Sequence, residues 1–214
     1  MPYFLDSNVF IGYYFFCGDM WGNQAKKLVE IPEQKHSSDH VWHECFGVDG
    51  CHGRCKTILQ EIKDEFFSAI SLLTKDRYSP VDLFSVVTEE KWRTMDIIQE
   101  LAARYEHDIK QLERKIRFAE RKYESDCDDR LSLLKKPAII QLHERDVEYP
   151  ELFRTLKSVI EDESDVVILL DAHHVGGTLA GLDFVSGDHY HVYRNRQTII
   201  DHTNIANVSF LDYF

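Results

Sequence analysis

Hydrophobic and polar residues follow two different patterns along this chain of 214 residues. Short apolar runs at residues 3–6, 182–186 and 208–211 are separated from one another by segments with helical spacing. Strands that alternate with helices predict a parallel sheet. Residues 56–136 show helical spacing alone. We therefore expect an α/β domain formed by residues 1–55 and 137–214, interrupted by a helical insertion at 56–136.

Apolar residues in the middle region recur at steps of three and four. One such segment runs from Leu59 to Leu73. A second starts at Thr88, a good N-cap, and continues to Tyr123 with the spacing of a coiled-coil seam. One helix of about 38 residues would be roughly 57 Å long, so we expect it to overhang the domain, to pack on residues 130–142 or to pair with another subunit. The seam favours a hairpin core or a homodimer contact over a ligand site.

The terminal regions contain further helix signals. Ser37-Ser38-Asp39 is typical of a helix start, and Gly176-Gly177 of a helix end. The other expected helices lie at residues 7–17, 21–30, 151–160, 165–175 and 189–201.

Composition limits the class of protein. The net charge of −12 argues against a surface that coats nucleic acid. Residues 89–136 contain 12 basic and 12 acidic residues, so the whole excess of negative charge lies outside that segment. No apolar run approaches the roughly 20 residues of a membrane span, and no signal peptide is visible. Five cysteines, an odd number, favour a reduced, cytoplasmic protein.

Asp6 stands at the strand edge where ligands of open α/β sheets usually bind, and further acids occur downstream in the chain. Asp6 follows the first strand, Glu44 lies in the helix after Ser38, Asp165 opens a helix with a buried run, and Asp188 follows a late strand. Alone, each is more typical of a cap, turn or surface residue. Together they indicate a site for Mg²⁺ or Mn²⁺, which take carboxylate oxygens as ligands.

Two neutral residues and several basic ones extend this hypothesis. Asn8 and Ser186 are suited to orienting substrate or water. The segment 110–122 holds six bases and two acids, which could contact an RNA backbone; a solvated face with intrahelical ion pairs is the favoured interpretation. The bases are Lys110, Arg114, Lys115, Arg117, Arg121 and Lys122.

Cysteines and histidines offer weaker candidates. The set His43, Cys45, Cys51, His52 and Cys55 lacks the Cys-x2-Cys pair of structural zinc sites, so buried or loop thiols are favoured. The histidines at 173, 174, 189 and 191 could face phosphate, although a histidine-rich surface is favoured. His189 is the best exception because it adjoins Asp188.

An ordered set of motifs resembles the PIN domain, the fold of VapC-type toxins and other metal-dependent ribonucleases. The matching residues are Leu5-Asp6-Ser7-Asn8-Val9, Glu44, Asp165 with Ala172, Val185-Ser186-Gly187-Asp188 and Arg194–Ile199. The resemblance covers residues 2–50 and 150–214. Three features depart from it: the helical insertion, the acidic Asp171 where the family has a small or apolar residue, and the cluster Asp162-Glu163-Asp165. We assign Asp165 because an unbroken apolar run follows it.

The resemblance implies a three-layer α/β/α domain with a central parallel sheet. It also implies an endoribonuclease that leaves a 5′-phosphate and a 3′-hydroxyl. Asp6, Asp165 and Asp188 would be Mg²⁺ or Mn²⁺ ligands, and Glu44 would bind directly or through water. The implied partners are RNA and an antitoxin-like protein.

Two other functions remain open. One is a catalytically inactive PIN-like scaffold that binds protein partners through its long helices. The other is a phosphotransfer enzyme of the haloacid-dehalogenase type, which is disfavoured because that family needs an Asp at the position of Asn8.

Overall fold

A parallel sheet of five strands forms the centre of the α/β part of the molecule. The computed structural model describes residues 1–16, 21–48, 53–75 and 78–214. The strands lie in the order β3-β2-β1-β4-β5, and every neighbouring pair is parallel. Their bounds are Tyr3–Leu5 for β1, Lys35–Ser38 for β2, Gln141–His143 for β3, Asp183–Ser186 for β4 and Asn207–Phe210 for β5. The predicted parallel sheet is confirmed.

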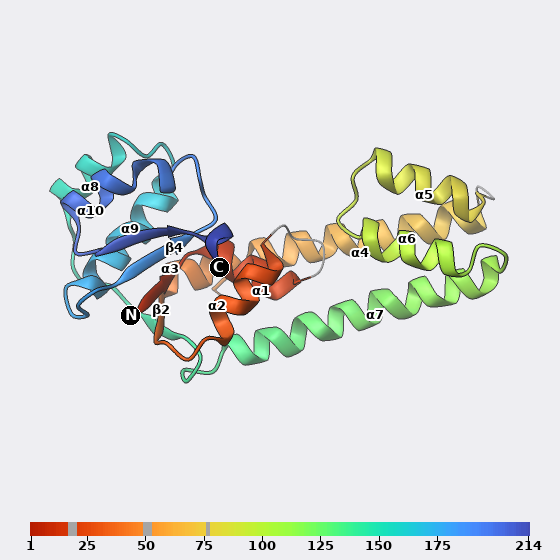
Figure 1. The fold of residues 1–214 in the computed structure, drawn as a ribbon, viewed down its shortest axis with the longest axis horizontal. Helices are drawn as coiled ribbons and strands as arrows, with labels where there is room; N and C mark the ends of the chain where they lie inside the picture. The colour runs from red at the N-terminus through yellow and green to blue at the C-terminus, as the bar shows by residue number, and fades with distance from the viewer. Residues whose placement is uncertain (17–20, 49–52, 76–77) are drawn as a thin grey trace.

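Helices connect the strands in two groups. The first group is α1 (Ser7–Phe15), α2 (Gly22–Glu30) and α3 (Asp39–Phe46); the second is α8 (Pro150–Lys157), α9 (Glu163–Gly176) and α10 (Arg196–His202). Crossovers between parallel strands are right-handed. The chain runs outward from β1 to β3 and returns to β4 and β5, so the two groups are expected on opposite faces. Figure 1 shows α8, α9 and α10 together, apart from α1 and α2. This arrangement is compatible with an α/β/α fold.

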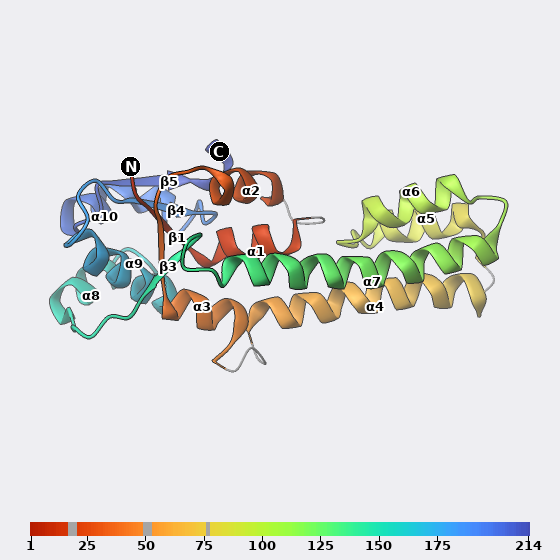
Figure 2. The same cartoon turned by 90° about the horizontal axis from the view of Figure 1, so that it is seen from below.

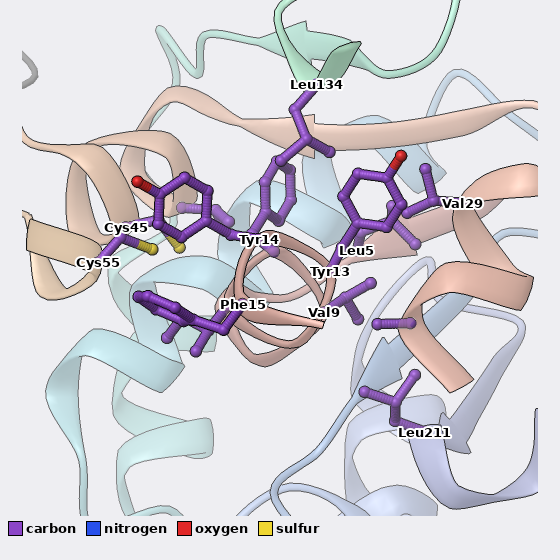
Figure 3. Close-up of a cluster of buried hydrophobic side chains, with 14 of the residues drawn as sticks. Leu5, Val9, Tyr13, Tyr14, Phe15, Val29, Cys45, Cys55, Leu134 and Leu211 are labelled. Carbon is purple, nitrogen blue, oxygen red and sulfur yellow. The ribbon is translucent and has the colours of Figure 1, made fainter. Parts of the chain in front are cut away.

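The core extends from the sheet into the helices around it. Leu5 and Val9 lie close to Tyr13 and Val29 in the part drawn in Figure 3. Phe4 and Phe184, on adjacent strands, stack with ring centroids 5.7 Å apart. Because α1 is buried on almost every side, its sequence is apolar throughout rather than on one stripe.

Four helices between α3 and β3 form a long arm. They are α4 (Arg54–Thr74), α5 (Pro80–Glu89), α6 (Met95–Arg104) and α7 (Ile109–Leu134). Figures 1 and 2 show α4 leading away from the sheet, α7 returning beside it, and α5 and α6 packed at the far end. The 26 residues of α7 span about 39 Å. None of the helices in the described ranges is long and apolar enough to cross a bilayer.

The expected single helix from Thr88 is wrong, because the chain turns twice within it. Thr88 is inside α5, where its hydroxyl donates to the Phe84 carbonyl, and Ser79 is the N-cap instead. The Glu65 carboxylate accepts hydrogen bonds from the backbone N–H groups of Arg93 and Thr94 and thereby holds the first turn.

The second turn lies between α6 and α7. Asp108 caps α7 by accepting a hydrogen bond from the Gln111 N–H at 2.9 Å. This turn falls where the seam spacing has two successive steps of four, from Leu101 to Tyr105 to Ile109. The buried seam residues Leu112, Ile116 and Tyr123 belong to α7, which packs against α4 within the same chain. The seam is thus a hairpin core, and a homodimer stays a prediction.

Other boundaries differ locally. Residues 189–201 are not one helix, since α10 begins only at Arg196 after a short 3₁₀ turn at Tyr193–Asn195. Strand β2 was not expected because its sequence, Lys-His-Ser-Ser, is polar although all four residues are buried. The helix start after it is confirmed, with Ser38 as the N-cap of α3. Residues 17, 50, 51 and 52, which bear on expected helix ends and thiols, lie outside the described residues.

Candidate functional site

The order in which strands are added to the sheet switches from one side of β1 to the other, and the switch point lies between β1 and β4. From β1 the chain adds β2 and β3 on one side, then returns to add β4 and β5 on the other. Ligands of open parallel sheets bind outside the carboxyl ends of the strands at such a point. Asp6 follows β1 directly, and Asp188 lies two residues beyond the end of β4. The sheet order therefore brings these two acids, 182 positions apart in the sequence (188 − 6), to one edge.

Asp6 is buried and held from three sides. Its carboxylate accepts hydrogen bonds from the Ser7 N–H at 2.6 Å, the Asn8 amide at 3.2 Å and the Ser186 hydroxyl at 2.6 Å. The Asp6 N–H donates to the Val185 carbonyl across the β1–β4 pair. Burial raises the pKa of Asp6, the charge of Glu44 adds to the rise, and the hydrogen bonds oppose it.

Asn8 and Ser186 were expected to orient substrate or water. In the structure both donate to Asp6, so they position a carboxylate. The Ser186 hydroxyl also accepts a hydrogen bond from the Asp188 N–H at 2.9 Å, which links the two acids through one side chain. A role of Asn8 or Ser186 toward substrate stays a prediction.

Asp165 and Asp188 meet at the mouth of the site together with His191. One ligand atom from each of the three residues lies within 4.8 Å of the other two. The Asp188 carboxylate accepts from the His191 N–H at 2.7 Å and lies 3.0 Å from its Nδ1 atom. Two carboxylates and one imidazole at this spacing could hold a divalent cation. It is the sole such grouping of three or more acids, histidines or cysteines within the described residues.

Glu44 approaches the site from α3. Its Oε1 atom accepts a hydrogen bond from Arg54 Nη1 at 2.7 Å. Its Oε2 atom is buried and has no hydrogen-bond partner among the described residues. A buried carboxylate oxygen without a donor is unfavourable. It is therefore available to a ligand that brings positive charge.

The carboxylates of the site raise the pKa of Asp165. Burial is the largest cause of a pKa of about 7 for Asp165, well above its ordinary 3.8. The charges of Asp6, Asp162, Asp188 and Glu44 add to the rise. Like charges this close favour a proton or a cation among them. All four predicted acids thus contribute to one electrostatic cluster.

The neighbouring acids are engaged elsewhere. Asp162 caps α9 by accepting from the Ser164 N–H at 2.8 Å. Asp171 is buried and bound by Arg145 Nε at 2.7 Å and His40 Nδ1 at 2.9 Å. A carboxylate already paired in this way is a poor candidate ligand, which favours Asp165.

Two residues of the candidate site were not predicted in their present positions: His191 was named only as a possible phosphate contact, and Arg54 was not named. His191, rather than His189, faces Asp188; the ring of His189 packs against Tyr193 and Phe210. The spacing Asp-x-x-His, which places both side chains on one turn, was the available signal. Arg54 had no signal, because only the folded chain brings the start of α4 to Glu44.

Several of the remaining candidates make structural contacts. Cys45 and Cys55 are buried free thiols, and burial raises the pKa of Cys45. Arg117 and Lys122 form ion pairs within α7, to Glu113 and Asp126. Figure 1 shows α7 on the arm, so the start of this basic segment lies at the end distant from the sheet. His173 and His174 hydrogen-bond to Asn204 and Tyr149.

No family model, no curated protein and no solved structure matches this chain. The resemblance to PIN domains therefore enters below only as a proposal.

Proposed function

We propose that the chain is a PIN-like endoribonuclease that depends on Mg²⁺ or Mn²⁺. The observation that supports it most is the convergence of four carboxylates, from four separate segments, at the switch point of a parallel sheet. Structural acids are usually paired with bases. Here the charges that act on Asp165 are those of other acids, and within the described residues the one ion pair of Asp188 is with His191.

The donor set fits a hard divalent cation. Asp165, Asp188 and His191 would hold it on the open side with two oxygens and one nitrogen. The unpartnered Oε2 atom of Glu44 would add a third oxygen. A bound Mg²⁺ or Mn²⁺ supplies a water made nucleophilic and neutralises charge on the phosphate. Asp6 would either bind the cation directly or hold the neighbouring carboxylates in position without binding it.

The protein's own residues would prepare this site. Ser186 and Asn8 fix the rotamer of Asp6 before any ligand arrives, which removes that entropic cost from binding. Arg54 holds one oxygen of Glu44 and leaves the other free. Arg54 is half exposed at this edge and could also meet a phosphate oxygen of the substrate.

RNA is the substrate class that the resemblance suggests, and the arm suggests how it would be held. Lys110, Arg114 and Arg121 are exposed on α7, and no ion pair involves them within the described ranges. A row of free bases on a projecting helix is suited to a phosphate backbone. The cytoplasm would be the expected compartment.

A second candidate is the inactive scaffold. Large apolar side chains on the arm favour it, since Phe67 and Phe118 are 62% and 64% exposed. Exposed apolar groups of this kind are typical of protein contacts. An antitoxin-like partner or a second copy would both fit such a surface.

Cleavage of a 5′-labelled single-stranded RNA tests the first proposal. We expect Mn²⁺ or Mg²⁺ to support cleavage that EDTA abolishes, with products carrying a 5′-phosphate and a 3′-hydroxyl. Asp165→Asn should abolish the activity, since it removes one charged oxygen ligand. Glu163→Gln is the matched control, because Glu163 is an exposed acid in the same helical turn. Equal activity in both variants would contradict the assignment, and no metal-dependent cleavage by the unmodified protein would favour the scaffold.

A further inference from the structure

A cavity of about 510 Å³ lies at the root of the arm, separate from the acidic cluster. It is enclosed by α1, α3, the first turn of α4 and the last turns of α7. Its aromatic wall is formed by Tyr14, Trp42 and Phe46, and its charged rim by Lys56, Asp128 and Lys135. Trp42 and Phe46 stand two positions to either side of Glu44 on α3. Two positions correspond to about 200° around a helix, so the cavity and the acids lie on different faces of α3.

Tyr14 adds a polar group, its hydroxyl, to the otherwise aromatic wall of the cavity. The side chain is more than nine-tenths buried and lines the cavity, and its hydroxyl makes no hydrogen bond within the described residues. Figure 3 shows the Tyr14 ring beside Cys45 and Cys55, with its hydroxyl at the outer end. Burial and neighbouring thiols raise the pKa of Tyr14, so it stays a neutral donor. The hydroxyl oxygen is not one of the fully buried atoms that lack a partner, so it can donate to a ligand in the cavity.

The charged side chains at the rim of the cavity form no ion pairs within the described residues. Within the described ranges, no ion pair involves the side chains of Lys56, Lys135 or Asp128. Lys56 stands in the first turn of α4, a helix of 21 residues whose N-cap, Gly53, provides no side-chain cap. The helix dipole there adds to the positive potential of the two lysines. An anion is therefore favoured at this side of the cavity.

We propose that the cavity binds one mononucleotide unit. The flat base would lie against Trp42 and Phe46, since aromatic side chains stack on bases of any kind. The phosphate would meet Lys56 and Lys135 at the start of α4. The Tyr14 hydroxyl would donate to a ring nitrogen or carbonyl, and the Asp128 carboxylate would accept from an exocyclic amino group. Cavities of 300–1,000 Å³ are typical for ligands of this size.

Nucleoside monophosphates test the proposal directly. Quenching of Trp42 fluorescence can be followed in the variant Trp21→Phe/Trp92→Phe, which leaves Trp42 as the one tryptophan. Titrations of AMP, GMP, CMP and UMP in EDTA keep the measurement independent of the proposed nuclease activity. We expect saturable quenching, with UMP weakest because uracil lacks an amino group. A 5′-phosphorylated adenine trinucleotide, compared with AMP, shows whether a free nucleotide or the end of an RNA chain is preferred.

Variants separate this site from non-specific binding. Lys56→Glu combined with Lys135→Glu should weaken AMP binding at least about tenfold. Tyr14→Phe, which removes only the hydroxyl, should weaken it about three- to tenfold. Lys75→Glu is the matched control, because Lys75 is an exposed lysine at the other end of α4. The proposal is overturned if none of the four monophosphates gives saturable quenching, or if the cavity variants bind as tightly as the control.

Discussion

Replacement of Asp165 by asparagine should stabilise the protein when no metal is present. Burial and nearby acids raise the pKa of Asp165 to about 7, whereas an exposed carboxyl in the unfolded chain titrates near 3.8. Above pH 7 the folded state must keep this residue charged beside other acids. Asparagine has the same shape and no charge, so it removes the repulsion.

The magnitude follows from the shift in pKa. Taken at face value, the shift corresponds to about 4 kcal/mol of destabilisation at pH 8. Asp165 is only partly buried, and solvent screens part of the effect, so we expect about 2 kcal/mol. Loss of a favourable charge at the start of α9 opposes it by roughly 0.5 kcal/mol. The net gain should raise the melting temperature by about 3–6 °C in a chain of this length.

The sign depends on pH. Between pH 4 and pH 7 the folded state binds more protons than the unfolded state, so this residue makes the unmodified protein more stable as the pH falls. The advantage of Asp165→Asn should therefore be full at pH 8 and nearly absent at pH 4. Urea denaturation in EDTA at both values measures it. Equal destabilisation at both pH values would refute the reasoning, because it would mark Asp165 as an ordinary helix-start residue.

Three further predictions concern other parts of the chain. Arg145→Met should cost about 3–5 kcal/mol, because it leaves the buried Asp171 with His40 alone; urea denaturation measures this, and a loss below about 1 kcal/mol would show that water replaces the arginine. Glu65→Gln should cost about 1–3 kcal/mol and speed amide hydrogen exchange at Thr94, whose N–H and hydroxyl the carboxylate accepts; unchanged exchange would contradict it. His191→Ala should weaken Mn²⁺ binding by about tenfold or more and Mg²⁺ binding less, because imidazole prefers transition metals; calorimetry decides, and an equal loss for both ions would exclude His191 as a ligand.

The sheet core and the acidic cluster were predictable because they rest on local patterns. Asp6 and Asp188 follow apolar strands, and parallel strands bring their carboxyl ends to one edge. Strand β2 was not predictable, because its residues Lys35 to Ser38 are polar but buried by their neighbours. Propensity does not report such burial.

Long-range contacts account for the other differences. The break between α5 and α6 depends on Glu65, about 28 residues earlier in the chain, whose carboxylate binds the turn. The N-cap signal at Thr88 and the apolar spacing from Ile98 onward indicated one helix. Arg54 reaches Glu44 only once α3 and α4 have packed. Spacing alone cannot report either contact.

A crystal soaked in Mn²⁺ would test the central claim most directly. We predict an anomalous density peak at the edge of the sheet between β1 and β4, within about 2.0–2.6 Å of carboxylate oxygens from Asp165 and Asp188. Soaked crystals of Glu163→Gln should show the same peak, and crystals of Asp165→Asn should lack it. A soaked crystal without a peak among Asp6, Glu44, Asp165 and Asp188 would contradict a cation site.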